Sequence, residues 1–263
     1  MSNRLYSCSD LSDKLYEHDL DTLLFINTVN SPSSSPFGIG GVSDILYSCD
    51  FVTDKLYEHD PDTLVVINTA NSPSSSSAGI GGISDRLYSC DSTTIKLYEH
   101  DPDTLAVLNT VNSPDTRPYG IGGILDRLYS CDSNADKLYE HNPDTLAVLN
   151  TVNSPNTEPI GIGGISDRLY SCDSTTLKLY EHNPDTLVVL NTVDGPDTLG
   201  TSGIGGTKTS IAIVKCDATG IKLEVSWTTA DTLGTYDVEY SYDNINWIRQ
   251  ATNCTSTDIV FLA

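Results

Sequence analysis

Short segments of five to seven residues, in which apolar residues are frequent, recur along most of the chain and are separated by turn residues. In one copy they are Gly79–Ile83, Arg86–Cys90, Lys96–His100 and Leu105–Val111. These stretches are rich in Leu, Val, Ile, Tyr and Thr and are bounded by Asp, Pro, Ser and Gly, which is typical of β-strands. No stretch of helical length shows a sustained apolar period of about 3.6 residues. The pattern therefore predicts an all-β chain in which each unit contributes four strands.

The four-strand unit repeats at a constant spacing of 41 residues, as five cysteines show: Cys8, Cys49, Cys90, Cys131 and Cys172. Four antiparallel strands in a repeat of about 40 residues are typical of one blade of a β-propeller. The segment Asp101–Thr104 between the third and fourth strands is expected to form a turn, because proline presets φ there and the Asp side chain can bond its own backbone. We expect the glycine-rich strand to be innermost, where neighbouring strands converge and leave little room for side chains.

The phase of the repeat predicts how the ring closes. The chain opens on a second strand, Leu5–Cys8, with no glycine-rich strand before it, and an extra glycine-rich strand, Gly203–Gly206, follows the fifth unit. That strand can complete the first blade, so both chain ends would seal the ring and remove its exposed edges. The prediction for residues 1–206 is a five-bladed β-propeller.

The motifs G-I-G-G, L-Y-S-C-D and K-L-Y-E-H-D-P-D-T-L carry a family resemblance. They resemble the repeats of non-WD propellers, and five nearly identical blades are similar to tachylectin-type lectins and other recently amplified propellers. The chain lacks the glycine-histidine and tryptophan-aspartate pairs of the WD subclass. The resemblance covers residues 1–206 and implies a lectin-like binding protein.

Residues 207–263 abandon the period, and their pattern predicts further strands. These are expected near Ser210–Cys216, Ile221–Thr228, Thr235–Tyr242, Trp247–Ala251 and Asp258–Leu262. The run L-E-V-S-W-T-T followed by Y-D-V-E-Y resembles the first half of a fibronectin type III domain, which implies that Trp227 is its core tryptophan. A complete module has seven strands, so the predicted β-sandwich at 207–263 is incomplete. It is cut short, leans on the propeller, or takes strands from another subunit. Cys216 and Cys254 are either disulfide-bonded or free.

Composition limits the partners. Thirty-six acidic residues against fourteen basic ones give a net charge of −22, which repels phosphate backbones, so no nucleic-acid partner is expected. No run of about 18 apolar residues is present, so no membrane insertion is expected. The N-terminus has no signal-peptide pattern. The expected location is a virion surface or the cell exterior, and a cytoplasmic location stays open.

The repeated cysteines and histidines are expected to be structural. Equivalent positions on a five-fold ring of about 10 Å radius lie roughly 12 Å apart, whereas zinc–thiolate bonds are about 2.3 Å long. All five histidines of the chain occupy one repeat position beside the Asp-containing turn: His18, His59, His100, His141 and His182. We expect them to support that turn, with a pH-sensitive or ligand-binding role as the alternative. No metal and no cofactor is expected.

Comparison of the five copies indicates where binding would occur. The turn between the third and fourth strands barely changes, whereas the loop between blades and the loop between the second and third strands vary. In propellers these two variable loops share one face, and variation on a rigid scaffold is typical of a recognition surface, with relaxed drift as the alternative. The candidate ligand-binding residues on that face are Phe37, Phe51, Arg117, Tyr119, Glu158 and Ile160.

Three functional hypotheses follow. Catalysis usually needs a unique set of groups, whereas the charged motifs here occur in five copies. The first hypothesis is therefore a non-enzymatic recognition or adhesion module for a glycan or protein ligand, on a virion surface or tail, with the C-terminal sandwich joining it to a larger assembly. The second is a lactonase- or cyclotransferase-like enzyme with an axial site. The third is a structural subunit that forms homo-oligomers through its C-terminal part.

Overall fold

The computed structural model describes residues 4–196 and 202–207, together with four short strands in the C-terminal part. The chain divides into two compact units, one comprising Asn3–Lys208 and the other comprising Thr209–Ala263 with Met1–Ser2. No helix that is long and apolar enough to cross a membrane occurs among the described residues.

The larger unit is a β-propeller of five four-stranded antiparallel sheets, each running from an innermost to an outermost strand. Blade one comprises β20 (Gly203–Thr207), β1 (Arg4–Ser9), β2 (Lys14–His18) and β3 (Phe25–Asn30). Blade two comprises β4 (Pro36–Val42), β5 (Ile45–Asp50), β6 (Lys55–His59) and β7 (Val66–Asn71). Blade three comprises β8 (Ser77–Ile83), β9 (Arg86–Asp91), β10 (Lys96–His100) and β11 (Val107–Asn112). Blade four comprises β12 (Pro118–Ile124), β13 (Arg127–Asp132), β14 (Lys137–His141) and β15 (Val148–Asn153). Blade five comprises β16 (Pro159–Ile165), β17 (Arg168–Asp173), β18 (Lys178–His182) and β19 (Val189–Asp194).

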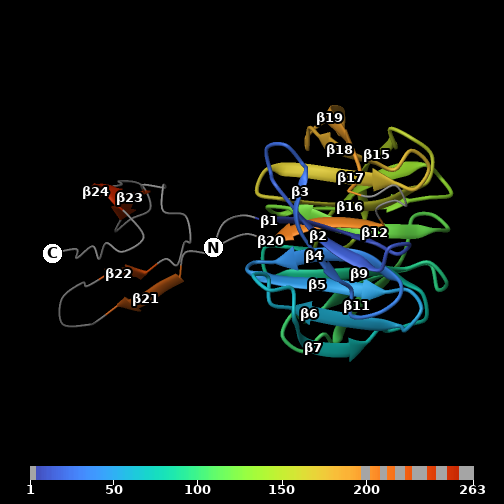
Figure 1. Cartoon of the computed structure of the whole chain (residues 1–263), viewed down its shortest axis with the longest axis horizontal. Helices are drawn as coiled ribbons and strands as arrows, with labels where there is room; N and C mark the ends of the chain where they lie inside the picture. The colour runs from blue at the N-terminus through green and yellow to red at the C-terminus, as the bar shows by residue number, and fades with distance from the viewer. Residues whose placement is uncertain are drawn as a thin grey trace. The chain divides into compact units, whose positions relative to one another are not determined.

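The ring is closed, and strands from the two ends of the repeat array form the closing pair. β20 pairs antiparallel with β1 in a register that places Leu5 opposite Gly206 and Cys8 opposite Gly203. Innermost strands contact each other around the whole ring: β4 with β8, β8 with β12, β12 with β16, β16 with β20, and β20 with β4. Figure 1 shows the strands of one blade, β4 to β7, side by side in that order. The predicted fold class and the predicted closure are confirmed.

The glycine-rich strands are innermost because backbone meets backbone there. A Cβ atom added to Gly40 would lie 2.7 Å from the Cα atom of Gly81 and 2.8 Å from the carbonyl oxygen of Ile80, both in the next blade. Real Cβ atoms do not approach backbone so closely, so the five inner strands pack only with glycine at such positions. The innermost placement of these strands is confirmed.

Each blade buries a face against the next blade, whereas its outermost strand is exposed. Tyr6, Cys8 and Leu15 of blade one form a single core cluster with Ile39 and Leu46 of blade two. On the outermost strands the Asn side chain accepts a hydrogen bond from the backbone N–H of the next residue, in all five blades. This bond occupies a backbone donor on the free edge, where an unpaired strand would otherwise invite pairing with another chain.

The five histidines hold the constant turn, as predicted. In blade one, Nδ1 of His18 donates to the carbonyl oxygen of Leu23 over 2.8 Å, and Nε2 accepts from the hydroxyl of Ser7 over 2.7 Å. Leu23 has a φ of 60°, a left-handed conformation that leucine rarely adopts, and its side chain is buried. Burial lowers the pKa of His18. The other four histidines make the same two hydrogen bonds, and burial lowers their pKa values too.

The five repeat cysteines are buried and free of disulfides. In blade two, Sγ of Cys49 lies against the glycine strand, 2.8 Å from where a Cβ atom on Gly38 would be. Burial raises the pKa of Cys49 to about 12, so the thiol is neutral. These thiols pack as small apolar groups between strands, in agreement with the structural interpretation.

The smaller unit contains four described strands in two antiparallel pairs. β21 (Ala212–Cys216) pairs with β22 (Leu223–Ser226), and β23 (Tyr236–Tyr240) pairs with β24 (Ile248–Cys254). They correspond to four of the five strands predicted for this part. The strand predicted at Asp258–Leu262, the environment of Trp227 and the bonding of Cys216 and Cys254 lie outside the described residues, and the fibronectin-like sandwich stays a prediction.

Candidate binding site

The two sets of variable loops lie on the same face of the propeller, as predicted. In blade two the backbone N–H of Phe51, after β5, donates to the carbonyl oxygen of Ser35, before β4, over 3.0 Å. The carboxylate of Asp50 also accepts from the backbone N–H of Ser35, over 2.9 Å. Blade four repeats the contact, with the N–H of Ser133 donating to the carbonyl of Arg117 over 3.1 Å. The constant turns lie at the opposite ends of the same strands.

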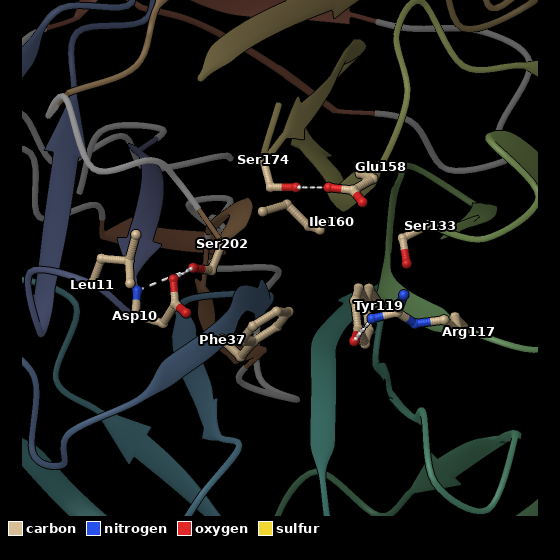
Figure 2. Close-up of a pocket in the computed structure, with 10 residues that line it drawn as sticks. All are labelled: Asp10, Leu11, Phe37, Arg117, Tyr119, Ser133, Glu158, Ile160, Ser174 and Ser202. Carbon is tan, nitrogen blue, oxygen red and sulfur yellow. Dashed lines mark hydrogen bonds between the residues drawn. The ribbon is translucent and has the colours of Figure 1, made fainter. Parts of the chain in front are cut away.

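A pocket of about 190 Å³ opens on this variable face and is shown in Figure 2. Five of the six predicted ligand-binding residues line it: Phe37, Arg117, Tyr119, Glu158 and Ile160. The sixth, Phe51, is not a lining residue, but its ring packs against Phe37 and Tyr119. Residues that vary among the five copies therefore gather around one pocket.

The asymmetry of the pocket arises at several repeat positions, and one of them is the residue before the first glycine of each inner strand. This position holds a different side chain in each blade: Phe37, Ala78, Tyr119, Ile160 and Ser202. A second ring is formed at the position after the second strand: Asp10, Phe51, Ser92, Ser133 and Ser174. Five-fold backbone symmetry thus carries an asymmetric set of side chains, with an aromatic side and a polar side.

The aromatic side is a cluster of three rings. The ring centroid of Phe37 lies 5.3 Å from that of Phe51 and 5.2 Å from that of Tyr119. The small side chain of Ala78, in the blade between Phe37 and Tyr119, packs in the same cluster. The guanidinium of Arg117 lies over the Tyr119 ring at 4.9 Å and donates from Nη2 to its hydroxyl over 2.6 Å. That hydrogen bond raises the pKa of Arg117.

The polar side combines carboxylates with serine hydroxyls. The hydroxyl of Ser174 donates to Oε2 of Glu158 over 3.0 Å, and the hydroxyl of Ser202 accepts from the backbone N–H of Asp10 over 3.0 Å (Figure 2). Ser133 differs from both serines. Ser133 is only 5% exposed, and its side-chain oxygen is buried. That oxygen has no hydrogen-bond partner within the described part of the chain. A buried hydroxyl without a partner costs free energy, so a ligand that pairs with it would recover that cost.

The space at the propeller axis, next to the pocket, has a volume of only about 10 Å³. The Gly and Ile residues of the inner strands line it, together with Tyr119 and Ile160. This is about the space needed for one water molecule. Tyr119 and Ile160 line both spaces, so they lie where the pocket meets the narrow space at the axis.

The polar half of the pocket was missed by the sequence-based prediction: Asp10, Leu11, Ser133, Ser174 and Ser202. The signal was present, because Asp10, Ser133 and Ser174 align with Phe51, and Ser202 aligns with Phe37. The aromatic and charged residues stand out at these positions, whereas the serines are ordinary loop residues. Within residues 4–196 and 202–207 no cluster of three or more His, Cys, Asp or Glu side chains is arranged to hold a metal ion.

No protein-family model and no curated protein matches the chain. Solved structures do match its fold. A chain of a nidogen/laminin complex aligns with a TM-score of 0.57 at 13% identity, covering 78% of this chain and 98% of that one. Glutaminyl cyclase from Myxococcus xanthus gives 0.50 at 15% identity, covering 64% and 88%, and the WD40 repeats of RRP9 give 0.50 at 8%, covering 73% and 60%. At these identities the matches show the propeller fold alone, and the resemblance to tachylectin-type lectins stays a prediction.

Proposed function

We propose that the propeller is a non-enzymatic glycan-binding module whose pocket on the variable face takes one neutral sugar residue. The observation that carries the proposal is the buried, unpartnered hydroxyl of Ser133 in a pocket that also presents two carboxylates and a guanidinium. A sugar offers several hydroxyls on a small frame, and each can donate to a carboxylate or bond to a serine.

Size and charge favour this ligand class. The volume of about 190 Å³ is below the range of about 300–1,000 Å³ typical of sites for drug-sized ligands. Arg117 contributes one positive charge against the negative charges of Asp10 and Glu158, so an anionic ligand gains little. The half-exposed faces of Phe37 and Tyr119 can pack against the C–H bonds of a pyranose, since aromatic faces carry partial negative charge.

The test is a glycan array probed with the labelled chain, followed by calorimetric titration of the sugars that bind. Ser133→Ala should weaken binding while leaving the free energy of unfolding unchanged or increased, because it removes an unpartnered buried hydroxyl. Val52→Ser, on an exposed side chain of the same face that does not line the pocket, is the matched control and should bind as the wild type does. Binding that survives both Ser133→Ala and Phe37→Ala would refute a pocket on this face.

Two other outcomes would support the remaining hypotheses. If no glycan on the array binds, but the chain captures a protein and Phe37→Ala weakens that capture, the ligand is a protein. No binding on the array, together with turnover of a lactone or of a peptide with N-terminal glutamine, would favour the propeller enzyme.

We propose that the C-terminal part joins the module to a larger assembly, and comparing the mass of the full chain with that of residues 1–208 tests this.

A further inference from the structure

Four arginines bridge neighbouring blades on the face opposite the pocket: Arg4, Arg86, Arg127 and Arg168. Each begins the second strand of its blade and binds a glutamate of the third strand. In blade three, Nη2 of Arg86 lies 2.7 Å from Oε1 of Glu99, while Nη1 reaches Oδ1 of Asp144 in the constant turn of blade four at 2.8 Å. Blade four repeats this bridge, with 2.8 Å to Glu140 and 2.7 Å to Asp185.

A glutamate and an aspartate also pair with the arginine at two more junctions, those of blades one and two and of blades five and one. Arg4 lies 3.3 Å from Glu17 and 2.8 Å from Asp62. Arg168 lies 2.7 Å from Glu181 and 3.8 Å from Asp21. The following tyrosine supplies a third surface, since the guanidinium carbon of Arg86 lies 5.5 Å from the centre of the Tyr88 ring. Guanidinium over an aromatic face is favourable.

The junction of blades two and three keeps the receiving groups but has no arginine. Ile45 occupies the arginine position and packs partly buried against the neighbouring core. Glu58 and Asp103 remain at the glutamate and aspartate positions, and no ion pair involves either of them in the part of the chain that the structure describes. Tyr47 keeps its place, with its hydroxyl donating to the carbonyl oxygen of Pro102 over 3.0 Å.

The electrostatics of the two kinds of junction differ accordingly. The pKa of Tyr47 is raised by burial and then by the negative charges of Glu58, Asp103, Asp101 and Asp44. At Tyr88 the nearby Arg86 opposes the rise in pKa. The blade two–three junction is therefore a locus of uncompensated negative charge, with Glu58, Asp103 and Tyr47 at the repeat positions that bind a guanidinium at the other four junctions.

We propose that this junction binds an arginine side chain of a partner protein. The glutamate, the aspartate of the next blade and the tyrosine ring would receive the guanidinium as they do for Arg86 and Arg127. Arginine rather than lysine is the expected residue, because the planar fork can donate to two carboxylates at once and stack on the ring, whereas an ammonium is a point charge. The site lies opposite the glycan pocket and is independent of it, so the propeller has two separate recognition faces.

The test is calorimetric titration of the full chain, at low ionic strength, with the peptide acetyl-Gly-Arg-Gly-amide. Versions of the peptide with lysine and with citrulline, the neutral isostere of arginine, serve as ligand controls. One arginine peptide should bind per chain, and the citrulline peptide should bind at least about tenfold more weakly because it cannot form charge-assisted bonds.

Two protein variants make the stoichiometry diagnostic. Ile45→Arg places an arginine of the chain itself at the junction and should abolish peptide binding. Arg127→Ile creates a second vacant junction and should raise the stoichiometry from one to two peptides per chain. Ser133→Ala, in the pocket on the other face, should leave binding unchanged.

The alternative is diffuse attraction between a cationic peptide and a chain of net charge −22. In that case Ile45→Arg would retain the peptide with nearly the same affinity and the lysine peptide would bind equally well. Either result, or no binding by the wild type, overturns the proposal. Thermal unfolding of each variant shows whether the propeller is intact, and Arg127→Gln, which is neutral and similar in length, replaces Arg127→Ile if the latter does not fold.

Discussion

The five buried histidines make the propeller sensitive to mild acid. Each is neutral in the fold, because Nδ1 donates to a carbonyl and Nε2 accepts from a serine hydroxyl, and burial holds its pKa below the ordinary value of 6.5. An unfolded chain takes up a proton on each histidine near pH 6.5, whereas the folded chain resists protonation until a lower pH. Stability is therefore complete above about pH 6.5 and is lost as the pH falls through the lowered pKa values.

The magnitude follows from the number of copies. One proton bound only by the unfolded state changes the free energy of unfolding by about 1.4 kcal/mol per pH unit. Five such histidines give a limiting slope of about 7 kcal/mol per pH unit, which is comparable to the whole stability of an ordinary domain. Asp60 and Asp101 in the constant turns titrate at lower pH, since hydrogen bonds from the threonine of the same turn lower their pKa values. The window between about pH 6.5 and about pH 5 thus reports the histidines.

The assay is urea unfolding followed by far-ultraviolet circular dichroism, repeated at closely spaced pH values across this window. His182→Asn is the matched variant, because the asparagine amide can still donate to the carbonyl of Leu187 but does not titrate. It should be less stable than the wild type at neutral pH and should show a slope lower by about one fifth, one proton in five. A wild-type stability that is flat between about pH 6.5 and about pH 5 would refute the neutral, buried state of these histidines.

Three further predictions concern packing and charge. Gly40→Ala should lower the free energy of unfolding by about 1–3 kcal/mol or prevent ring closure, because its Cβ would meet the Gly81 backbone at 2.7 Å. Chemical denaturation measures this effect, with Ser75→Ala, on an exposed residue, as the control. Ile45→Arg should raise the free energy of unfolding by up to about 1 kcal/mol, the range for a partly exposed pair, and equal or lower stability in thermal melts would contradict the missing-bridge interpretation. Cys131, whose pKa burial raises, should resist a thiol reagent in the native state and react after unfolding, as should the other repeat cysteines. Rapid labelling of Cys131 in the native chain, located by peptide mass, would show that the inner packing is open.

The sequence was sufficient for the fold because the repeat restates the same local rules five times. Proline and aspartate mark each constant turn, alternating Leu and Tyr mark the strands, and the unpaired glycine strand at Gly203–Gly206 reveals how the ring closes. The role of the histidines also followed from their position beside the turn. What could not be predicted was the left-handed Leu at each turn, for example Leu23, because only the tertiary burial of its side chain compensates for the strain.

The candidate site was half predictable. Aromatic and charged outliers among the copies identified Phe37, Arg117, Tyr119 and Glu158, which the fold gathers around one pocket. The serines were overlooked because serine is ordinary in loops, and the special property of Ser133, its unpartnered hydroxyl, depends on its surroundings in three dimensions. For the C-terminal part the strand positions were predictable from alternation, whereas the kind of domain they form was not established.

The pairing of β20 with β1 has a consequence for how the molecule is made. The contact between Asp10 and Ser202 joins residues 192 positions apart, and a ribosome must deliver nearly the whole array before the first blade can acquire its innermost strand. Until then the first blade of the nascent chain lacks its innermost strand, because pairing between residues so far apart in the sequence is slow to form. Because the G-I-G-G segments are nearly interchangeable, the same segment of a second chain can pair with that blade instead when the protein is concentrated. Dilution during refolding should therefore favour single rings over linked pairs.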